Sequence, residues 1–262
     1  MEDLPRHAAG SGQLSLVADA VDVWLAFDMH FKANEIQAEF AGLLTPHDVE
    51  RMQLLHLDAR KRQFALTRAL QRQVLSAYAT DVSPTRWKFQ SSTEGRPSLA
   101  QPFDRTDLHF NLAHTEGVVA MAVCRHERVG IDVEKLGRAP LAVAERYFSA
   151  VEAAQLRAMP AESQPRRFMR IWTLKESYLK AVGTGLAGGL ARMSFVFDSA
   201  GNFRFERDDD GDARRWQFCQ YDVGAEHVLS LAVLPRAGDL PLRVNLREFA
   251  VARSGQEQGS QP

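Results

Sequence analysis

The sequence has few cysteines and no long hydrophobic run. Only two of its 262 residues are cysteines. Cys124 in VVAMAVC and Cys219 in WQFCQY lie in strand-like apolar runs, where a small buried side chain is the expected role. No window approaches the ~18 apolar residues of a membrane span, and the N-terminal MEDLPRHAAGSGQ lacks the apolar core of a signal peptide. We therefore expect a cytosolic protein without disulfide bonds.

The sequence also lacks an excess of either charge. It has 32 basic and 33 acidic residues, which leave a formal net charge of −1. No global field should therefore draw the protein to nucleic acid or to an anionic membrane, and any anion site must be local. Apolar residues make up 45% of the chain, which is enough to bury one large core or two small ones.

Hydrophobic patterning predicts an α+β fold, because helices and strands are segregated along the chain rather than alternating. A helix should begin at Thr45-Pro46, since proline favours the first helical position. The closely spaced runs between 108 and 134 indicate antiparallel strands joined by short turns. The predicted strands are 21–27, 108–114, 118–124, 128–134, 193–198, 203–207, 215–222, 227–234 and 242–249, and the other helices are 59–79, 149–159 and 166–182.

The two halves of the chain look alike in outline, each with a strand, helices and further strands. We predict an N-terminal subdomain at 16–126 and a C-terminal subdomain at 127–250, pseudo-equivalent to each other. Each is expected to be an antiparallel sheet packed with helices. Residues 1–15 and 251–262 are expected to be flexible ends, because the tail is polar and poor in apolar residues.

The segment GIDVE carries two carboxylates, Asp132 and Glu134, two residues apart in a β-branched run. On a strand both point to the same face, while Ile131 and Val133 bury the other. An isolated pair of this kind is usually solvent-facing. Two like charges side by side repel, however, unless a cation lies between them. Hard oxygen ligands favour Mg²⁺.

The segment WTLKESYLK places Trp172, Glu176 and Lys180 four residues apart, so they share one side of a helix. The ordinary interpretation is an exposed ion pair contributing roughly 0.2–0.5 kcal/mol. Together with GIDVE, however, the segment supplies a third carboxylate and an ammonium. Three carboxylates and a lysine indicate magnesium and phosphate chemistry.

Two further patterns are set aside. Gly183, Gly185 and Gly188 spell GxGxxG, but they follow a helix and precede a strand, the reverse of the dinucleotide-binding context. We interpret the first two as a helix stop and its turn. ERDDDGDARRWQ resembles a calcium loop, yet Glu206 occupies its first position and Gln217 replaces the closing glutamate. We expect a polar hairpin turn between 203–207 and 215–222 instead.

Taken together and in this order, the motifs resemble the phosphopantetheinyl transferases, specifically the two-subdomain, surfactin-synthetase-activating type. The resemblance implies an active-site cleft between the subdomains of a monomeric enzyme. Such an enzyme moves phosphopantetheine from coenzyme A to a serine of an apo acyl or peptidyl carrier protein, and it releases adenosine 3′,5′-bisphosphate. The matching segments are LTRALQR (66–72), TEGRPSL (93–99), FNLAHTEG (110–117), VGIDVEK (129–135), RYFSAVE (146–152) and WTLKESYLKAVGTGL (172–186).

The resemblance also implies roles for individual residues. The family's Mg²⁺ ligands fall on Asp132, Glu134 and Glu176, and its phosphate-contacting, catalytic lysine falls on Lys180. The base for the serine hydroxyl is left open between Glu152 and Glu176, the latter acting directly or through a metal-bound water. Glu152 has a second interpretation, because Ser149-Ala-Val-Glu152 is also a capping box.

The coenzyme A side of the family site falls on other positions. His114 matches a phosphate contact, Gly95-Arg96-Pro97 matches an element against the adenine end of the cofactor, and Arg68 matches a basic position near the 3′-phosphate. The resemblance thus places coenzyme A on the N-terminal side and the metal on the C-terminal side. The family usually has serine where this chain has Ala113, so one hydroxyl is missing from the expected phosphate pocket.

Two alternative functions remain open from the residues alone. The same three carboxylates could serve another magnesium-dependent phosphoryl enzyme, such as a nucleotide or coenzyme A pyrophosphatase. A non-catalytic carrier-binding or coenzyme A-binding module is the other alternative, although an intact set of Asp132, Glu134, Glu176 and Lys180 argues against it.

Overall fold

The computed structural model describes residues 6–9, 13–31, 36–93, 95–138, 140–185, 189–207, 213–236 and 241–251. The helices are α1 (Ile36–Glu39), α2 (Pro46–Gln53), α3 (Asp58–Tyr78), α4 (Leu141–Tyr147), α5 (Ala150–Arg157) and α6 (Gln164–Val182). The strands are β1 (Arg6–Ala9), β2 (Ala20–Phe27), β3 (Phe89–Ser91), β4 (Pro97–Leu99), β5 (His109–Thr115), β6 (Val118–Cys124), β7 (Val129–Lys135), β8 (Met193–Phe197), β9 (Phe203–Arg207), β10 (Gln217–Val223), β11 (His227–Val233) and β12 (Arg243–Val251).

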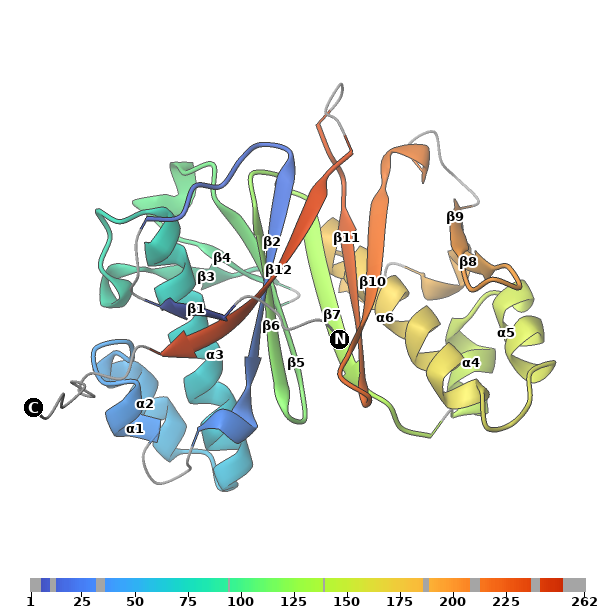
Figure 1. Ribbon diagram of the computed structural model, residues 1–262, viewed down its shortest axis with the longest axis horizontal. Helices are drawn as coiled ribbons and strands as arrows, with labels where there is room; N and C mark the ends of the chain where they lie inside the picture. The colour runs from blue at the N-terminus through green and yellow to red at the C-terminus, as the bar shows by residue number, and fades with distance from the viewer. Residues whose placement is uncertain are drawn as a thin grey trace, which may run out of the picture.

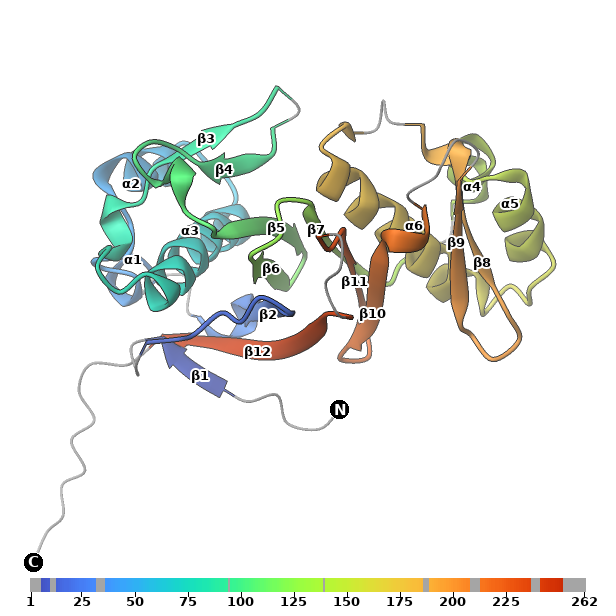
Figure 2. The same ribbon diagram turned by 90° about the horizontal axis from the view of Figure 1, so that it is seen from above.

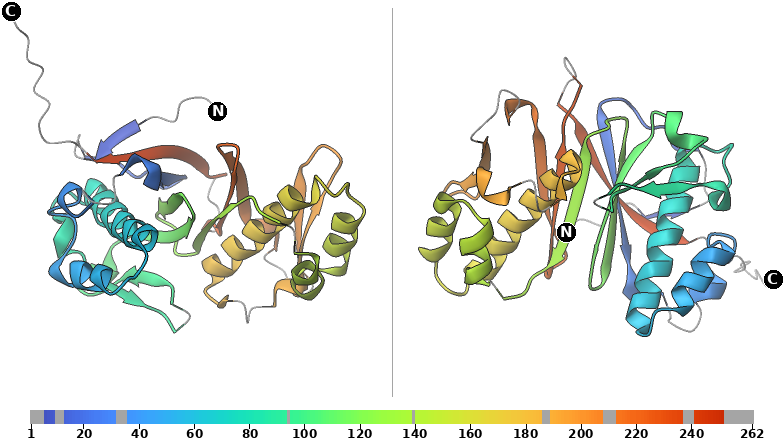
Figure 3. Two further views of the ribbon diagram at one scale, coloured as in Figure 1. Left: turned by 90° about the horizontal axis from the view of Figure 1, so that it is seen from below. Right: turned by 180° about the vertical axis from the view of Figure 1, so that it is seen from behind.

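Strands occupy the middle of the molecule and helices its two outer sides (Figure 1), which confirms the α+β class. A five-stranded sheet has the order β1-β12-β2-β6-β5, and a three-stranded sheet has the order β10-β11-β7. Two small sheets, β3-β4 and β8-β9, complete the described strands. Seen from behind, α3 lies over the first large sheet and α6 over the second (Figure 3).

Alternation along β2 explains this layering. Val21, Val23 and Leu25 belong to an apolar cluster shared with β7 and β11, whereas Trp24 and Ala26 belong to a cluster shared with α3. Both faces of β2 are therefore buried, one against the other sheet and one against a helix. A third cluster, around Phe148, Ile171 and Phe195, lies on the other side of the second sheet.

The predicted helix ends are confirmed where capping was recognised. The Thr45 hydroxyl accepts a hydrogen bond from Asp48 N at 3.2 Å, and α2 begins at the next residue. Helix α6 ends at Gly183, whose φ of +81° is the left-handed conformation that glycine adopts without strain. Gly188 and the calcium-like residues 208–212 lie outside the described residues.

Three pairing predictions were wrong. Strand β7 does not continue the β5–β6 meander, but pairs with β11 and starts the second sheet. Strands β9 and β10 do not form a hairpin, since β9 pairs with β8 and β10 with β11. Strand β12 lies within the segment assigned to the C-terminal subdomain, but it pairs in parallel with β2, so the first sheet is mixed rather than antiparallel. The partners of β7 and β12 are distant in sequence, whereas β8–β9 and β10–β11 are pairs of consecutive strands; local periodicity alone does not select either kind of partner. The subdomain boundaries themselves stay a prediction.

The two large sheets meet where edge strand β5 lies beside edge strand β7. No β5–β7 ladder joins them in the described residues; side chains cross the junction instead. The Asn111 side-chain oxygen accepts a hydrogen bond from Ile131 N at 2.9 Å. Thr115 Oγ1 donates to Glu134 Oε2 at 3.2 Å. This junction brings the end of β5 next to the GIDVE strand.

Cys124 is buried, Cys219 is half-buried, and both are free thiols, as the sequence predicted. Among the described residues, no helix is long and apolar enough to cross a membrane.

Candidate active site

Gly130 allows α6 to lie unusually close to β7. A Cβ atom at this position would come 2.0 Å from Ser177 O and 2.5 Å from Ala181 N, so no other residue fits without moving the helix. Gly130 therefore faces α6, and by strand alternation Asp132 and Glu134 face the same side. Gly130 was not singled out from the sequence, although a glycine inside a strand often marks such a close backbone approach.

Lys180 on α6 reaches across to Asp132 on β7. Its Nζ lies 2.7 Å from Asp132 Oδ1 and 3.1 Å from the carbonyl oxygen of Ile131. The Asp132 side chain is 7% exposed and that of Lys180 is 30% exposed. The ammonium is thus anchored to the strand on one side while remaining accessible on the other.

Glu176 and Glu134 complete a group of three acids that we call the carboxylate cluster: Asp132, Glu134 and Glu176. Burial first, then the charge of Asp132, raise the pKa of Glu176 to about 7, while Lys180 opposes the shift. Burial and Asp132 also raise the pKa of Glu134. The three carboxylates therefore act on one another electrostatically.

The carboxylate cluster has unused buried oxygens. Among the described residues, no hydrogen-bond donor reaches Asp132 Oδ2 or Glu176 Oε1, although both atoms are buried. Unpaired buried carboxylate oxygens are costly, and a hard cation would satisfy them. Within the described part of the chain, however, no three His, Cys, Asp or Glu side chains are already arranged to hold a metal. Asp132, Glu134 and Glu176 thus have the charge and the oxygen donors that a hard cation requires, but their side chains are not arranged as a complete coordination shell.

A pocket of about 480 Å³ is lined by residues of α2, α3, the β3–β4 hairpin and β5; we call it the α3 pocket. Four of the residues predicted to bind the cofactor line it: Arg68 from α3, Gly95 and Pro97 from the β3–β4 hairpin, and His114 from β5. These residues are distant in the sequence, and the fold brings them to one cavity.

The rest of the α3 pocket has the character of an anion site with an apolar wall. Arg51 and Arg60 add positive charge, and Phe64 and Leu112 add apolar surface. Arg68 lies 5.4 Å from the centre of the Phe64 ring, a cation–π distance. Arg51 and Arg60 were not singled out from the sequence, because single arginines on a helix surface carry no signal until the pocket is formed.

Asp48 connects two arginines of α3 that have different roles. Arg68 lies 3.5 Å from Asp48 and also faces the pocket. Arg72 is buried and lies 2.9 Å from the same carboxylate, and it donates further hydrogen bonds to the carbonyl oxygens of Pro84 and Trp87. Arg72 is thus a structural residue, whereas part of the Arg68 guanidinium remains available to a ligand in the α3 pocket.

His114 lines the α3 pocket, and the next residue, Thr115, hydrogen-bonds Glu134 of the carboxylate cluster. Burial lowers the pKa of the histidine, Lys180 and Arg60 lower it further, and Asp132 opposes them. The imidazole is therefore held neutral near pH 7, where one ring nitrogen donates and the other accepts hydrogen bonds.

Two predicted site residues are not brought together with the others. Arg96 lines a neighbouring cavity of about 330 Å³, and its guanidinium binds backbone carbonyl oxygens. Glu152 is fully buried: Oε2 lies 2.7 Å from Lys175 Nζ and accepts from Ser149 N, and Oε1 accepts from Phe195 N at 2.8 Å. Its capping-box interpretation is confirmed.

The site thus combines a basic pocket with a carboxylate cluster and a lysine, the features of an enzyme acting at a phosphate ester. The family model of the 4′-phosphopantetheinyl transferase superfamily matches residues 128–232. HetI, a 4′-phosphopantetheinyl transferase of Nostoc sp., is 32% identical over 66% of this chain and 73% of its own length. A phosphopantetheinyl transferase of Thraustochytrium sp. is 30% identical over 82% of this chain and 84% of its own.

The chain belongs to the 4′-phosphopantetheinyl transferase superfamily, a family of enzymes. The 4′-phosphopantetheinyl transferase Sfp of Bacillus subtilis is also similar, with 29% identity over 68% of this chain and 77% of its own. Among solved structures, the holo-[acyl-carrier-protein] synthase of Thermotoga maritima matches 42% of this chain and 64% of its own at 24% identity, with a TM-score of 0.35.

Proposed function

We propose that this protein transfers 4′-phosphopantetheine from coenzyme A to a serine hydroxyl of an apo carrier protein and releases adenosine 3′,5′-bisphosphate. The observation that carries the proposal is that β5 joins the two parts of the site: His114 lines the α3 pocket, and the next residue, Thr115, donates a hydrogen bond to Glu134 of the carboxylate cluster. A phosphate-rich nucleotide fits the first part, and cleavage of its pyrophosphate fits the second.

In this proposal the nucleotide end of coenzyme A occupies the α3 pocket. Arg68, together with Arg51 and Arg60, neutralises its phosphates, while Phe64 offers an apolar wall. Neutral His114 donates one hydrogen bond to a phosphate oxygen. Gly95 and Pro97 contribute the opposite wall.

Asp132, Glu134 and Glu176 would hold Mg²⁺. The unpaired buried oxygens of Asp132 and Glu176 support this assignment. When bound, the cation would offset negative charge on the pyrophosphate of coenzyme A.

Lys180 acts on the leaving phosphate. Its ammonium is anchored by Asp132 and Ile131 O and is partly accessible. Negative charge grows on the leaving group as the bond breaks, so a fixed ammonium stabilises the transition state more than the ground state.

We assign the base to Glu176. Glu176 is half-buried beside Lys180 and keeps an oxygen that no donor among the described residues reaches, so it would take the serine proton directly or through a metal-bound water. Both Glu152 oxygens are already hydrogen-bonded within the buried pair with Lys175, so Glu152 is not proposed as the base. We further propose that the enzyme works as a monomer in the cytosol, where coenzyme A and apo carriers meet.

A panel of apo carrier proteins tests the function. Each carrier, from fatty acid, polyketide, nonribosomal peptide or lysine-biosynthetic systems, is incubated with the protein, coenzyme A and Mg²⁺ and weighed by intact-mass spectrometry. A mass gain equal to phosphopantetheine, absent when the carrier serine is replaced by alanine, is expected. Turnover of coenzyme A without any carrier would identify a pyrophosphatase instead. A biological effect that survives Asp132→Ala would favour a non-catalytic module.

A further inference from the structure

Arg96 connects the wall of the α3 pocket to the backbone of the carboxylate cluster. Its guanidinium donates hydrogen bonds to the carbonyl oxygens of Ala181 at 3.2 Å, Val129 at 3.1 Å and Glu127 at 3.3 Å. Ala181 directly follows Lys180 in the last turn of α6. Val129 begins β7, three residues before Asp132. One side chain therefore holds both elements of the cluster at their adjoining ends.

Hydrogen bonds connect the described residues on either side of the β3–β4 turn that carries Arg96. Gly95 has a φ of +83°, and Gly95 N donates to Ser92 O at 3.0 Å. Ser92 N donates to Arg96 O at 2.9 Å, and Arg96 N donates to the Ser92 hydroxyl at 3.2 Å. The β3–β4 hairpin and the end of α6 lie on the same side of the molecule (Figure 2). Gly95 and Pro97 line the α3 pocket, so the residues before and after Arg96 face the proposed ligand.

We propose that Arg96 is a positioning residue that couples occupation of the α3 pocket to the placement of Lys180 and Asp132. The inference rests on the proposed function, because it assumes that a nucleotide binds the pocket. A ligand against Gly95 and Pro97 restricts the hairpin. Because the Arg96 guanidinium is hydrogen-bonded to the end of α6 and the start of β7, a less mobile hairpin also limits the motion of these two ends. The planar guanidinium of arginine carries several N–H donors in fixed directions, so it can hold three carbonyl oxygens at once. A lysine ammonium cannot reach the three carbonyls in the same geometry.

Hydrogen–deuterium exchange with adenosine 3′,5′-bisphosphate as the probe tests the coupling without catalysis. In the wild-type protein, the probe should slow amide exchange in the last turn of α6 and at the start of β7. In Arg96→Met, the probe should bind with a Kd within about threefold of wild type, because the pocket side chains are intact, but this protection should be lost.

Steady-state kinetics with an apo carrier provide the second readout. Arg96→Met should lower kcat at least tenfold and change KM for coenzyme A less than about threefold, as expected when a transition-state interaction is lost. Arg96→Lys should recover part of kcat. Arg166→Met is the matched control, since Arg166 ties the opposite end of α6 to the β10–β11 turn through Asp222 and Ala225 O. It should leave kcat unchanged.

The outcomes separate the coupling from the proposed function. If wild-type protein transfers phosphopantetheine but Arg96→Met keeps its ligand-induced protection, the coupling is wrong and the function stands.

A large loss of probe affinity with kcat unchanged would make Arg96 a direct ligand contact instead. Equal losses of kcat in Arg96→Met and Arg166→Met at equal melting temperature would reduce Arg96 to a structural role. Should Arg96→Met fail to fold, Arg96→Lys carries the same comparison. Wild-type protein that neither binds the probe nor modifies any carrier overturns the proposed function first.

Discussion

Two lysines of α6 each form an ion pair with a carboxylate at the same distance, but the two pairs differ in burial and in how completely they are hydrogen-bonded. Lys175 Nζ lies 2.7 Å from Glu152, and Lys180 Nζ lies 2.7 Å from Asp132. Lys175 and Glu152 are both fully buried. Lys175 also donates to the carbonyl oxygens of Leu190 and Met193, each at 2.7 Å. The described structure thus satisfies both partners, and the pair ties α6 to the segments around it.

The second pair is incomplete. Asp132 keeps a buried oxygen that no donor among the described residues reaches, as does the neighbouring Glu176, and Lys180 remains partly exposed. Fully satisfied buried networks rigidify a fold, whereas unsatisfied ones call for a missing partner. The distance between charges therefore does not distinguish the two pairs. The remaining hydrogen-bonding capacity does, and it supports the proposal that Asp132, Glu176 and Lys180 belong to the active site.

The largest expected effect is on stability, at the buried pair. Glu152→Gln leaves the Lys175 ammonium without a counter-charge, and breaking a buried ion pair in this way costs about 3–5 kcal/mol. Urea denaturation should show this loss, while activity per folded molecule should persist. The control is Glu145→Gln, which removes an exposed partner 3.4 Å from Arg157 and should change little. A Glu152→Gln variant that is as stable as wild type but inactive would restore Glu152 as the base.

The second effect is on catalysis, at the incomplete pair. Lys180→Ala should lower kcat by roughly 10²–10³, the range seen when one donor to a developing negative charge is removed. The affinity for coenzyme A should change much less, because the ammonium acts mainly in the transition state. Single-turnover kinetics and calorimetric binding measure the two separately. An unchanged kcat would remove Lys180 from the mechanism.

A smaller effect concerns the pH dependence of stability. Burial, then Asp132, raise the pKa of Glu176 from an ordinary 4.5 to about 7. Between these values the folded state binds more protons than the unfolded state, so wild-type stability falls as pH rises through this window. Glu176→Gln should lack that fall and be about 1–2 kcal/mol more stable than wild type at pH 8, after allowance for partial exposure.

Urea titrations at pH 5 and pH 8 in EDTA measure this difference, and Mg²⁺ at pH 8 should stabilise wild type more than Glu176→Gln. Parallel pH curves for the two proteins would show that Glu176 is not strained in the folded state.

The comparison also shows what sequence reasoning could find. The period of two in GIDVE and of four in WTLKESYLK are local, so the shared faces of Asp132 with Glu134 and of Glu176 with Lys180 could be predicted. The partners of Glu152 and Arg96 could not, because Lys175 meets Glu152 only when α6 packs against α5, and Ala181 meets Arg96 only when residues from the two halves of the chain come together. The same holds for β7, which leaves the predicted meander to pair with β11. The local sequence pattern predicts which residues share one face of a strand or helix. Tertiary contacts determine which other element packs against that face.

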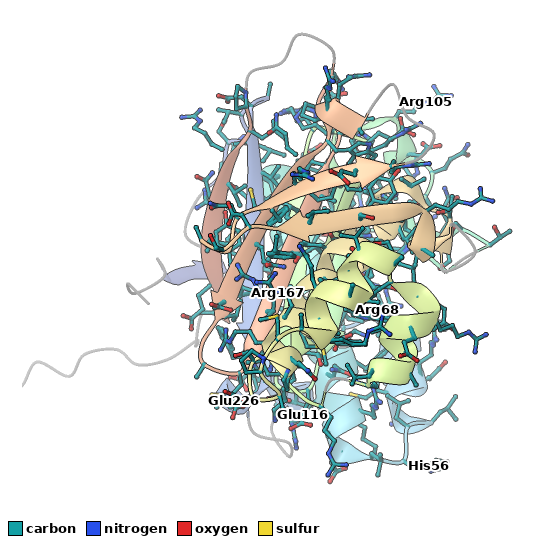
Figure 4. All side chains as sticks on the ribbon, turned by 90° about the vertical axis from the view of Figure 1, so that its right-hand side faces the viewer. His56, Arg68, Arg105, Glu116, Arg167 and Glu226 are labelled. Atoms are coloured by element: carbon teal, nitrogen blue, oxygen red, sulfur yellow. The ribbon has the colours of Figure 1, made fainter. Side chains whose placement is uncertain are left out.

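The smallest expected effect belongs to a third pair, Lys135 and Glu116, which also lie 2.7 Å apart. Here Glu116 is exposed and Lys135 is partly exposed, and Lys135 lies 3.7 Å from Glu226 as well; the two glutamates lie near each other in Figure 4. Water and salt screen such pairs. Lys135→Ala should therefore barely move the urea midpoint, and 1 M salt should erase what difference remains. A large, salt-resistant loss would mean that the shared 2.7 Å separation, and not the burial of the pair, sets its contribution to stability.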